Sequence, residues 1–433
     1  TGYGYCTEIR SKAMSRKNSN GILTTTAVIA ESFRNIHITE EGILQLLDNR
    51  MFIHLFDSIP DFRQQSKIVY KLPDLLLLIF LTILRRGKAS FLDIAYAIKA
   101  NRRTYIAYGL LPEDMTPSHD TIRRVLTMID GNELYQNTIQ GFYMFLEYLK
   151  KHYTVEGDYR HLCIDGKEMR GSGRASDTKN PQHNYSMLNI YEASSFTIIE
   201  CEAIDKKENE IPVAQRLLEK MDLKNAVITA DALHCQKKTA FIIHEGKGIY
   251  VLIAKDNQKT LLEEIISRFN RYPDKVRKYE DDDRTIEIME LPKNYALKDE
   301  WVGLKSFVKM ISKKCTRYFI SNTNDDLLIC QAISNRWAVE TFHKLKDYDM
   351  NEDAVRSTDK QALRNIAMMN NLGEQLYTLF QTISGLPHRE AKVYFQENTI
   401  ECLNIILSVM SSEQIVDSLV KDLKKRRRKR NKV

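Results

Sequence analysis

The chain has 433 residues, of which 43% are apolar and 28% are charged, with only 17 Gly and 9 Pro. This is the composition of an ordinary globular protein, and it excludes collagen-like and low-complexity classes. At roughly 150 residues per domain, the length predicts two or three domains.

The net charge of +7 is concentrated at the C-terminus. Residues 424–432 read KKRRRKRNK, and without these eight basic residues 56 basic residues stand against 57 acidic ones, a net charge of −1. Because adjacent like charges repel, we expect residues 424–433 to form a disordered tail until they meet an anion. Nucleic acid fits, since neutralised phosphates release condensed counterions. A solubilising tail without a specific partner is the alternative.

The cysteines and apolar segments favour a cytoplasmic protein. The seven cysteines are odd in number and never spaced C-x-x-C, which argues against a disulfide framework and a structural zinc site. The longest apolar run, Leu75 to Leu84, has ten residues and is too short to span a bilayer. The N-terminal residues carry charge without an apolar stretch, so we expect neither a secretory signal nor a membrane partner.

The first part of the chain predicts helices. Residues 1–40 are polar and are expected to form a loosely held lead-in, whereas residues 41–150 have helical patterns. Leu72–Arg85 predicts one helix, closed by Gly87, and the apolar stripe over Phe91–Ile98 predicts a second.

A third helix carries basic residues. Ser118 precedes apolar residues spaced i, i+3, i+4 and i+7, the pattern of an N-capped amphipathic helix. Arg123 and Arg124 lie toward its outer side. The helical domain is therefore either a DNA-binding module resembling a helix-turn-helix, with these arginines at the DNA, or only a packing domain.

From about residue 155 the pattern changes to short β-rich runs with helical patterns between the later ones. The runs are 161–164, 196–204, 226–229 and 250–254, and the helical patterns are 213–221, 234–244 and 260–269. Strands first and then alternation predict an α/β domain with a mixed sheet over residues 155–385. Residues 284–321 form a strand-rich insertion, helices follow from Leu328 to about 382, and 386–423 form a C-terminal helical segment.

Two predicted strands end in an aspartate. Leu162-Cys163-Ile164 leads into Asp165, and Ala226 to Ala230 leads into Asp231. In open α/β sheets the carboxyl ends of strands face the ligand crevice, so neighbouring strands would bring the two aspartates together. Each also has a structural explanation: Asp165-Gly166 is a turn signal, and Asp231 suits the N-cap of a helix.

Glu340 is the third candidate. Projected on a helix, it falls on the side of Ile329, Ile333 and Trp337, where apolar groups are hidden. A buried carboxylate needs a cation, either Arg336 four residues earlier or a divalent ion shared with the two aspartates. Three carboxylates suit Mg²⁺ or Mn²⁺. Two such ions roughly 3.5–4 Å apart clamp the attacking and leaving oxygens of a phosphodiester.

Basic residues near these carboxylates are candidates for phosphate contacts. Lys255 ends a predicted strand on the same edge, Lys167 and Arg170 follow Asp165, and two more flank Glu340. Solvated surface charge is the alternative for any one of them. The DNA-binding candidates are Lys167, Arg170, Lys255, Arg336 and Lys344, together with the two arginines of the helical domain.

Seven segments occur in an order that resembles a known family. They are PSHDTIRRV at 117–125, CIDGK at 163–167, KENEI at 207–211, ITADALHCQ at 228–236, YVLIAKDNQ at 250–258, RWAVE at 336–340 and NEDA at 351–354. Over residues 45–380 the series resembles the H-repeat-associated (ISAs-type) insertion-sequence transposases of bacteria. These belong to the DDE superfamily.

The resemblance implies an RNase-H-like catalytic domain, a mixed sheet flanked by helices, preceded by an all-α domain over about 45–150. It implies metal-dependent cleavage at insertion-sequence ends and strand transfer of the 3′-OH into target DNA. Asp165, Asp231 and Glu340 would be catalytic and would hold two Mg²⁺ or Mn²⁺ ions. The expected partners are terminal-repeat DNA, target DNA and further copies of the chain, at the nucleoid.

Two alternatives stay open at this stage. A metal-dependent nuclease or resolvase needs the same carboxylates but performs no strand transfer. A decayed transposase would act only as a DNA-binding protein.

Overall fold

The structure is a computed structural model of the chain. It describes residues 54–57, 59–87, 90–107, 109–131, 134, 159–172, 184–193, 197–204, 209–281, 284–355, 357, 359–384, 386–399, 401–403 and 406. The predicted lead-in over 1–40 and the basic tail over 424–433 lie outside the described residues.

The chain divides into two compact units. One is built from residues 1–154, 171–181 and 345–433, and the other from residues 155–170 and 182–344. We call them the helical unit and the sheet unit. Among the residues that the structure describes, no helix combines the length and apolar character needed to cross a membrane.

The helical unit is built from helices at both ends of the chain. They are α4 (His54–Asp57), η1 (Gln65–Lys67), α5 (Leu72–Arg86), α6 (Phe91–Ala100), α7 (Arg102–Ala107), α8 (His119–Met128), η7 (Glu352–Ala354), α15 (Lys360–Ser384) and α16 (His388–Glu397). The predicted helices at 72–85, 91–98 and 118–129 are confirmed. The Ser118 side chain accepts a hydrogen bond from the amide of Thr121, the expected N-cap.

The sheet unit contains one mixed sheet of nine strands. They are β1 (Arg160–Met169), β2 (Tyr185–Glu192), β3 (Thr197–Ile204), β4 (Ala226–Ala230), β5 (Ile249–Ala254), β6 (Val276–Asp281), β7 (Arg284–Glu290), β8 (Ser306–Ser312) and β9 (Thr316–Ser321). Their order is β3-β2-β1-β4-β5-β9-β8-β7-β6. The pairs β1–β4 and β4–β5 are parallel, and all others are antiparallel.

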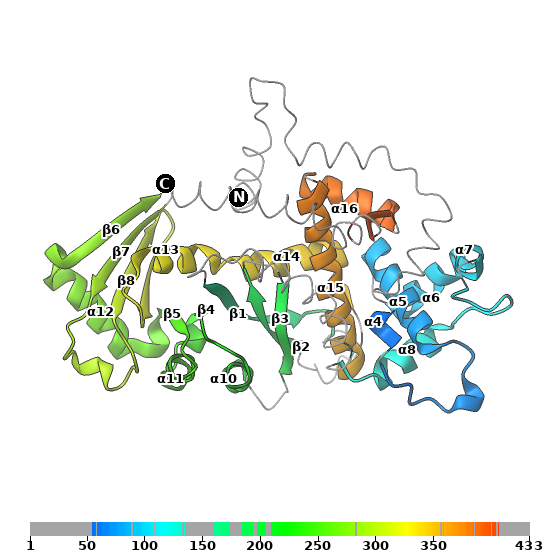
Figure 1. Cartoon of the computed structure of the whole chain (residues 1–433), viewed down its shortest axis with the longest axis horizontal. Helices are drawn as coiled ribbons and strands as arrows, with labels where there is room; N and C mark the ends of the chain where they lie inside the picture. The colour runs from blue at the N-terminus through cyan, green and yellow to red at the C-terminus, as the bar shows by residue number, and fades with distance from the viewer. Residues whose placement is uncertain are drawn as a thin grey trace, which may run out of the picture. The chain divides into compact units, whose positions relative to one another are not determined.

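Helices flank this sheet on both sides (Figure 1). They are α10 (Glu210–Lys220), η3 (Ala232–His234), α11 (Lys237–Glu245), η4 (Asp256–Gln258), α12 (Lys259–Arg271), η5 (Pro273–Lys275), η6 (Ala296–Lys298), α13 (Asp326–Asn335) and α14 (Ala338–Met350). The predicted fold class, a mixed α/β sheet flanked by helices with a helical N-terminal region, is confirmed. The strand-rich insertion begins at β6 and extends the same sheet beyond β5.

Side-chain alternation fixes which side chains face which helices. On one face, Val227 of β4 and Val251 of β5 pack with Ile329 and Ile333 of α13. On the other face, a Cβ at Gly166 of β1 would lie 2.3 Å from the carboxylate of Glu210 in α10. Because successive side chains of a strand alternate, the odd-numbered residues of β1 and β4 share the α13 face.

Gly87 closes α5 in a left-handed conformation with φ +56°. A Cβ there would lie 2.1 Å from the carbonyl oxygen of Asp349, whereas a Cβ at Gly109, with φ +70°, would meet nothing within 4 Å. Both glycines are left-handed, so an alanine is strained at either position, but only at Gly87 does it also clash.

We therefore expect Gly87→Ala to lower the free energy of unfolding by about 2 kcal/mol more than Gly109→Ala. Urea unfolding of the two variants measures the difference. Equal losses would show that the contact with Asp349 does not constrain position 87.

Candidate active site

Asp165 and Asp231 lie side by side on neighbouring strands. In the parallel register of β1 and β4, Ile164 is paired with Ala230, so the next residue on each strand is one of the two aspartates. Neighbouring strands are about 4.8 Å apart. Both positions are odd-numbered and share the α13 face, so the two carboxylates belong to one side of the sheet.

Of the structural explanations for the two aspartates, the turn at Asp165 is wrong, and the N-cap at Asp231 holds for its position but not for its side chain. Asp165 is not in a turn, because β1 continues to Met169 and pairs Asp165 with Asn189 of β2. Asp231 precedes η3, but its side chain makes no capping hydrogen bond. It instead accepts from Arg336, with Nη1 2.9 Å from Oδ1.

Glu340 does not lie on one continuous helix with Ile329 and Ile333. The helix breaks, since α13 ends at Asn335 and α14 begins at Ala338. The expectation that Glu340 is hidden is therefore wrong: its side chain is 37% exposed, and its Oε1 accepts from Arg336 Nη2 at 3.1 Å. The predicted ion pair with Arg336 is present.

Arg336 links the second aspartate to the glutamate. Its guanidinium contacts Asp231 and Glu340 and is only 7% exposed. The guanidinium carbon lies 4.4 Å from the centre of the Trp337 ring, which covers it. Arg336 therefore holds two of the predicted carboxylates together. To reach a phosphate, it would have to leave them.

His343, which sequence reasoning missed, holds the first aspartate. Its Nδ1 lies 3.2 Å from Oδ2 of Asp165, and its Nε2 lies 3.1 Å from Nδ2 of Asn189. The Asn189 amide donates to Nε2, so a neutral ring with its proton on Nδ1 donates to Asp165. His343 is buried. Its spacing of three residues from Glu340, which puts both on one face of α14, is the signal available in the sequence.

The basic residues predicted to contact phosphate differ in their position in the fold and in their exposure. Lys255 is exposed just after β5, the strand parallel to β4, and therefore at the same edge as Asp231. Lys167 is half-buried within β1, while Arg170 and Lys344 are exposed. The arginines of the helical unit, 123 and 124, are exposed on α8, and Arg123 lies 3.4 Å from Asp120.

Cys163, two residues before Asp165 on the same strand face, is unsuited to nucleophilic catalysis. Burial raises the pKa of its thiol to about 11, and its Sγ donates to the carbonyl of Asn335 at 3.3 Å. At neutral pH the thiol stays protonated. Cys163 is therefore not a candidate nucleophile.

The donor set fits a hard divalent cation. Asp165, Asp231 and Glu340 offer oxygen ligands from β1, the end of β4 and α14, and Cys163 on the same face is a buried, protonated thiol. The Arg336 guanidinium already supplies positive charge between two of these carboxylates. A site that gathers carboxylates around a cation is suited to Mg²⁺ or Mn²⁺ by its ligand chemistry.

Comparison with protein families agrees with this arrangement. The family described as "Transposase DDE domain" matches residues 156–372, half of the chain. The chain belongs to this family. A second family, described as "DDE_Tnp_1-associated", matches residues 53–140. The three carboxylates lie in the transposase DDE domain, and α5 to α8 lie in the associated region.

Curated relatives carry the same description. "H repeat-associated putative transposase YbfD" of Escherichia coli K12 is 30% identical over 203 residues, 47% of this chain and 75% of that protein. "Putative transposase YncI" of E. coli O157:H7 is 29% identical over 363 residues, 77% of this chain and 89% of that protein. The predicted resemblance to H-repeat-associated transposases is confirmed.

A solved structure also aligns with the chain. It is a piggyBac transposase synaptic complex with hairpin DNA, 11% identical, covering 93% of this chain and 85% of that chain with a TM-score of 0.40. At this identity and TM-score, the similarity supports no conclusion about the function of this chain.

Removing the charge of Arg336 should destabilise this transposase DDE domain. In a buffer that contains a metal chelator, we expect Arg336→Gln to lower the free energy of unfolding by about 1–2 kcal/mol. The reason is that Asp231 and Glu340 then face each other without a cation. Adding Glu340→Gln should recover part of the loss. Urea unfolding of the single and double variants measures both effects.

Arg317→Gln is the matched control, since that guanidinium also lies over Trp337, at 5.2 Å. A loss in Arg336→Gln no larger than in Arg317→Gln, and unchanged by Glu340→Gln, would contradict the role given to Arg336.

Proposed function

We propose that this chain catalyses metal-dependent phosphodiester cleavage at the ends of an insertion sequence and transfers the freed 3′-OH to target DNA. The observations that carry the proposal are that Asp165 and Asp231 follow the paired residues Ile164 and Ala230, and that Arg336 joins Asp231 to Glu340. Membership of the transposase DDE family supports it. Because two ends must be held together for joining, we also propose that the protein acts as a homo-oligomer on DNA, at the nucleoid of the cytoplasm.

In this proposal, Asp165, Asp231 and Glu340 would hold two Mg²⁺ or Mn²⁺ ions. When bound, such ions polarise the phosphate and lower the pKa of water or a 3′-hydroxyl that attacks it. The carboxylates contribute negative charge and fixed positions. His343 keeps one oxygen of Asp165 in place, with Asn189 behind it. Before the ions bind, Arg336 keeps Asp231 and Glu340 close and neutralised.

Basic side chains then hold the DNA backbone. Lys255 stands at the edge where β4 and β5 end, beside Asp231, and suits a phosphate contact as a point charge. Lys167, Arg170 and Lys344 are further candidates around the site. We assign Arg123 and Arg124 of α8 to DNA bound by the helical unit. None of these contacts reads sequence by itself, since phosphate contacts position the protein without specifying bases.

A strand-transfer assay tests the proposal. With pre-cut 3′-OH ends, a target plasmid and Mg²⁺, the wild-type protein should give joined product. Asp165→Asn, Asp231→Asn and Glu340→Gln should each lower the joining rate by at least about a hundredfold, because a lost carboxylate ligand removes transition-state stabilisation. DNA binding measured by filter retention should remain.

The same assay separates the alternatives. Cleavage of uncut ends without joined product from pre-cut ends would favour a nuclease or resolvase. Unchanged biological activity and DNA binding in Asp165→Asn would favour a protein that only binds DNA and would overturn the catalytic proposal.

Deleting residues 424–433 should weaken binding to any DNA and flatten its salt dependence. The tail carries eight basic residues, and each phosphate contact that it makes contributes about one unit to the slope of log affinity against log salt concentration. DNA-binding titrations between about 50 and 200 mM salt measure the slope. An unchanged slope in the truncated protein would rule the tail out as a DNA contact.

A further inference from the structure

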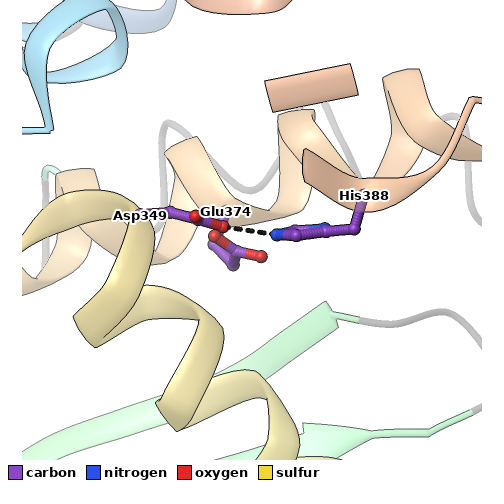
Figure 2. Close-up of side chains that lie close together, drawn as sticks. All are labelled: Asp349, Glu374 and His388. Carbon is purple, nitrogen blue, oxygen red and sulfur yellow. Dashed lines mark hydrogen bonds and ion pairs between the residues drawn. The ribbon is translucent and has the colours of Figure 1, made fainter. Parts of the chain in front are cut away.

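A second group of ionisable side chains lies in the helical unit, where three helices meet. Asp349 is near the end of α14, Glu374 is in the middle of α15, and His388 is the first residue of α16. Figure 2 shows the three side chains pointing toward one another. This group, which we call the three-helix cluster, shares no residue with the candidate active site.

The geometry of the three-helix cluster is that of a ligand set. One ligand atom from each residue lies within 4.8 Å of the other two. His388 Nε2 is 2.8 Å from Oδ2 of Asp349. The side chain of Asp349 is fully buried, and that of His388 is 17% exposed. A site so enclosed excludes bulk water, so the charges must be balanced by groups inside it.

Glu374 is the member of the cluster that lacks a hydrogen-bond partner. It is fully buried, and neither of its carboxyl oxygens has such a partner among the described residues. Leaving a buried polar group unpaired is costly, so a carboxyl aimed into the cluster in this way favours a cation as its ligand.

The nearby lysine contacts the outer oxygen of Asp349. Lys392 Nζ contacts Oδ1 of Asp349 at 2.9 Å and the carbonyl oxygen of Tyr348 at 3.2 Å. It therefore engages the oxygen of Asp349 that does not face His388. Oδ2 of Asp349, Nε2 of His388 and the carboxyl of Glu374 stay directed at one another. Metal-binding carboxylates are often held in this way by a charged group behind them.

We propose that Asp349, Glu374 and His388 bind one divalent transition-metal ion. One imidazole with two carboxylates suits Zn²⁺ or, with lower affinity, Mn²⁺. The ion would join α14, α15 and α16 and so fix the C-terminal helices of the unit. It would give the Glu374 carboxyl the partner that it does not have among the described side chains. This site is structural and independent of the DDE carboxylates.

Metal content of the full chain tests the site. We use Asp165→Asn/Asp231→Asn as the parent, so that ions at the candidate active site are not counted. After chelation and dialysis against Zn²⁺, mass spectrometry of the metal should find about one equivalent in the parent and less than about a tenth in the parent with Glu374→Gln. Glu390→Gln, an exposed position on α16 two residues after His388, is the control and should keep the ion.

Thermal unfolding of the same proteins is a second readout. Zn²⁺ at about a hundred times its dissociation constant should raise the Tm of the parent by about 5 °C. It should leave the Tm of the Glu374→Gln protein unchanged. A parent that binds no Zn²⁺ or Mn²⁺ and shows no shift would overturn the proposal. So would a Glu374→Gln protein that binds as much metal as the parent.

Discussion

The candidate active site depends on the parallel pairing of β1 with β4. Because Ile164 pairs with Ala230, the two aspartates that follow are neighbours, and because side chains alternate they share one face. A slip of one residue would send the side chain of Asp231 to the opposite face of the sheet. The register is fixed by burial, since β4 is buried along its whole length and residues on both of its faces pack against helices.

Like charges so close together need a cation. Arg336 supplies one from the break between α13 and α14, with its guanidinium covered by Trp337 and in contact with Asp231 and Glu340. Arg336 lies four residues before Glu340, the spacing at which side chains of successive helical turns meet, and its other terminal nitrogen reaches Asp231. On our proposal the divalent ions take over the neutralising role, so the site has a cationic partner for its carboxylates with and without metal.

Much of this could be predicted from the sequence, for identifiable reasons. Apolar periodicity and the Ser118 cap located the helices at 72–85, 91–98 and 118–129. The aspartate after an apolar run indicated the end of β4, whereas Asp165 was wrongly expected to end its strand and lies inside β1. The β2 strand was missed because buried polar residues, among them Asn189, interrupt its apolar pattern. The edge strand β6 was missed because it is rich in charge. His343 was missed since its partner Asp165 lies 178 positions earlier in the chain, and only the folded sheet brings the two together.

The most direct test of the account is anomalous diffraction from crystals soaked in Mn²⁺. We expect a peak about 2.0–2.2 Å from carboxylate oxygens of both aspartates of the sheet edge and of Glu340. A fully occupied Mn²⁺ elsewhere in the protein, with no peak between these carboxylates in the presence of DNA, would contradict it.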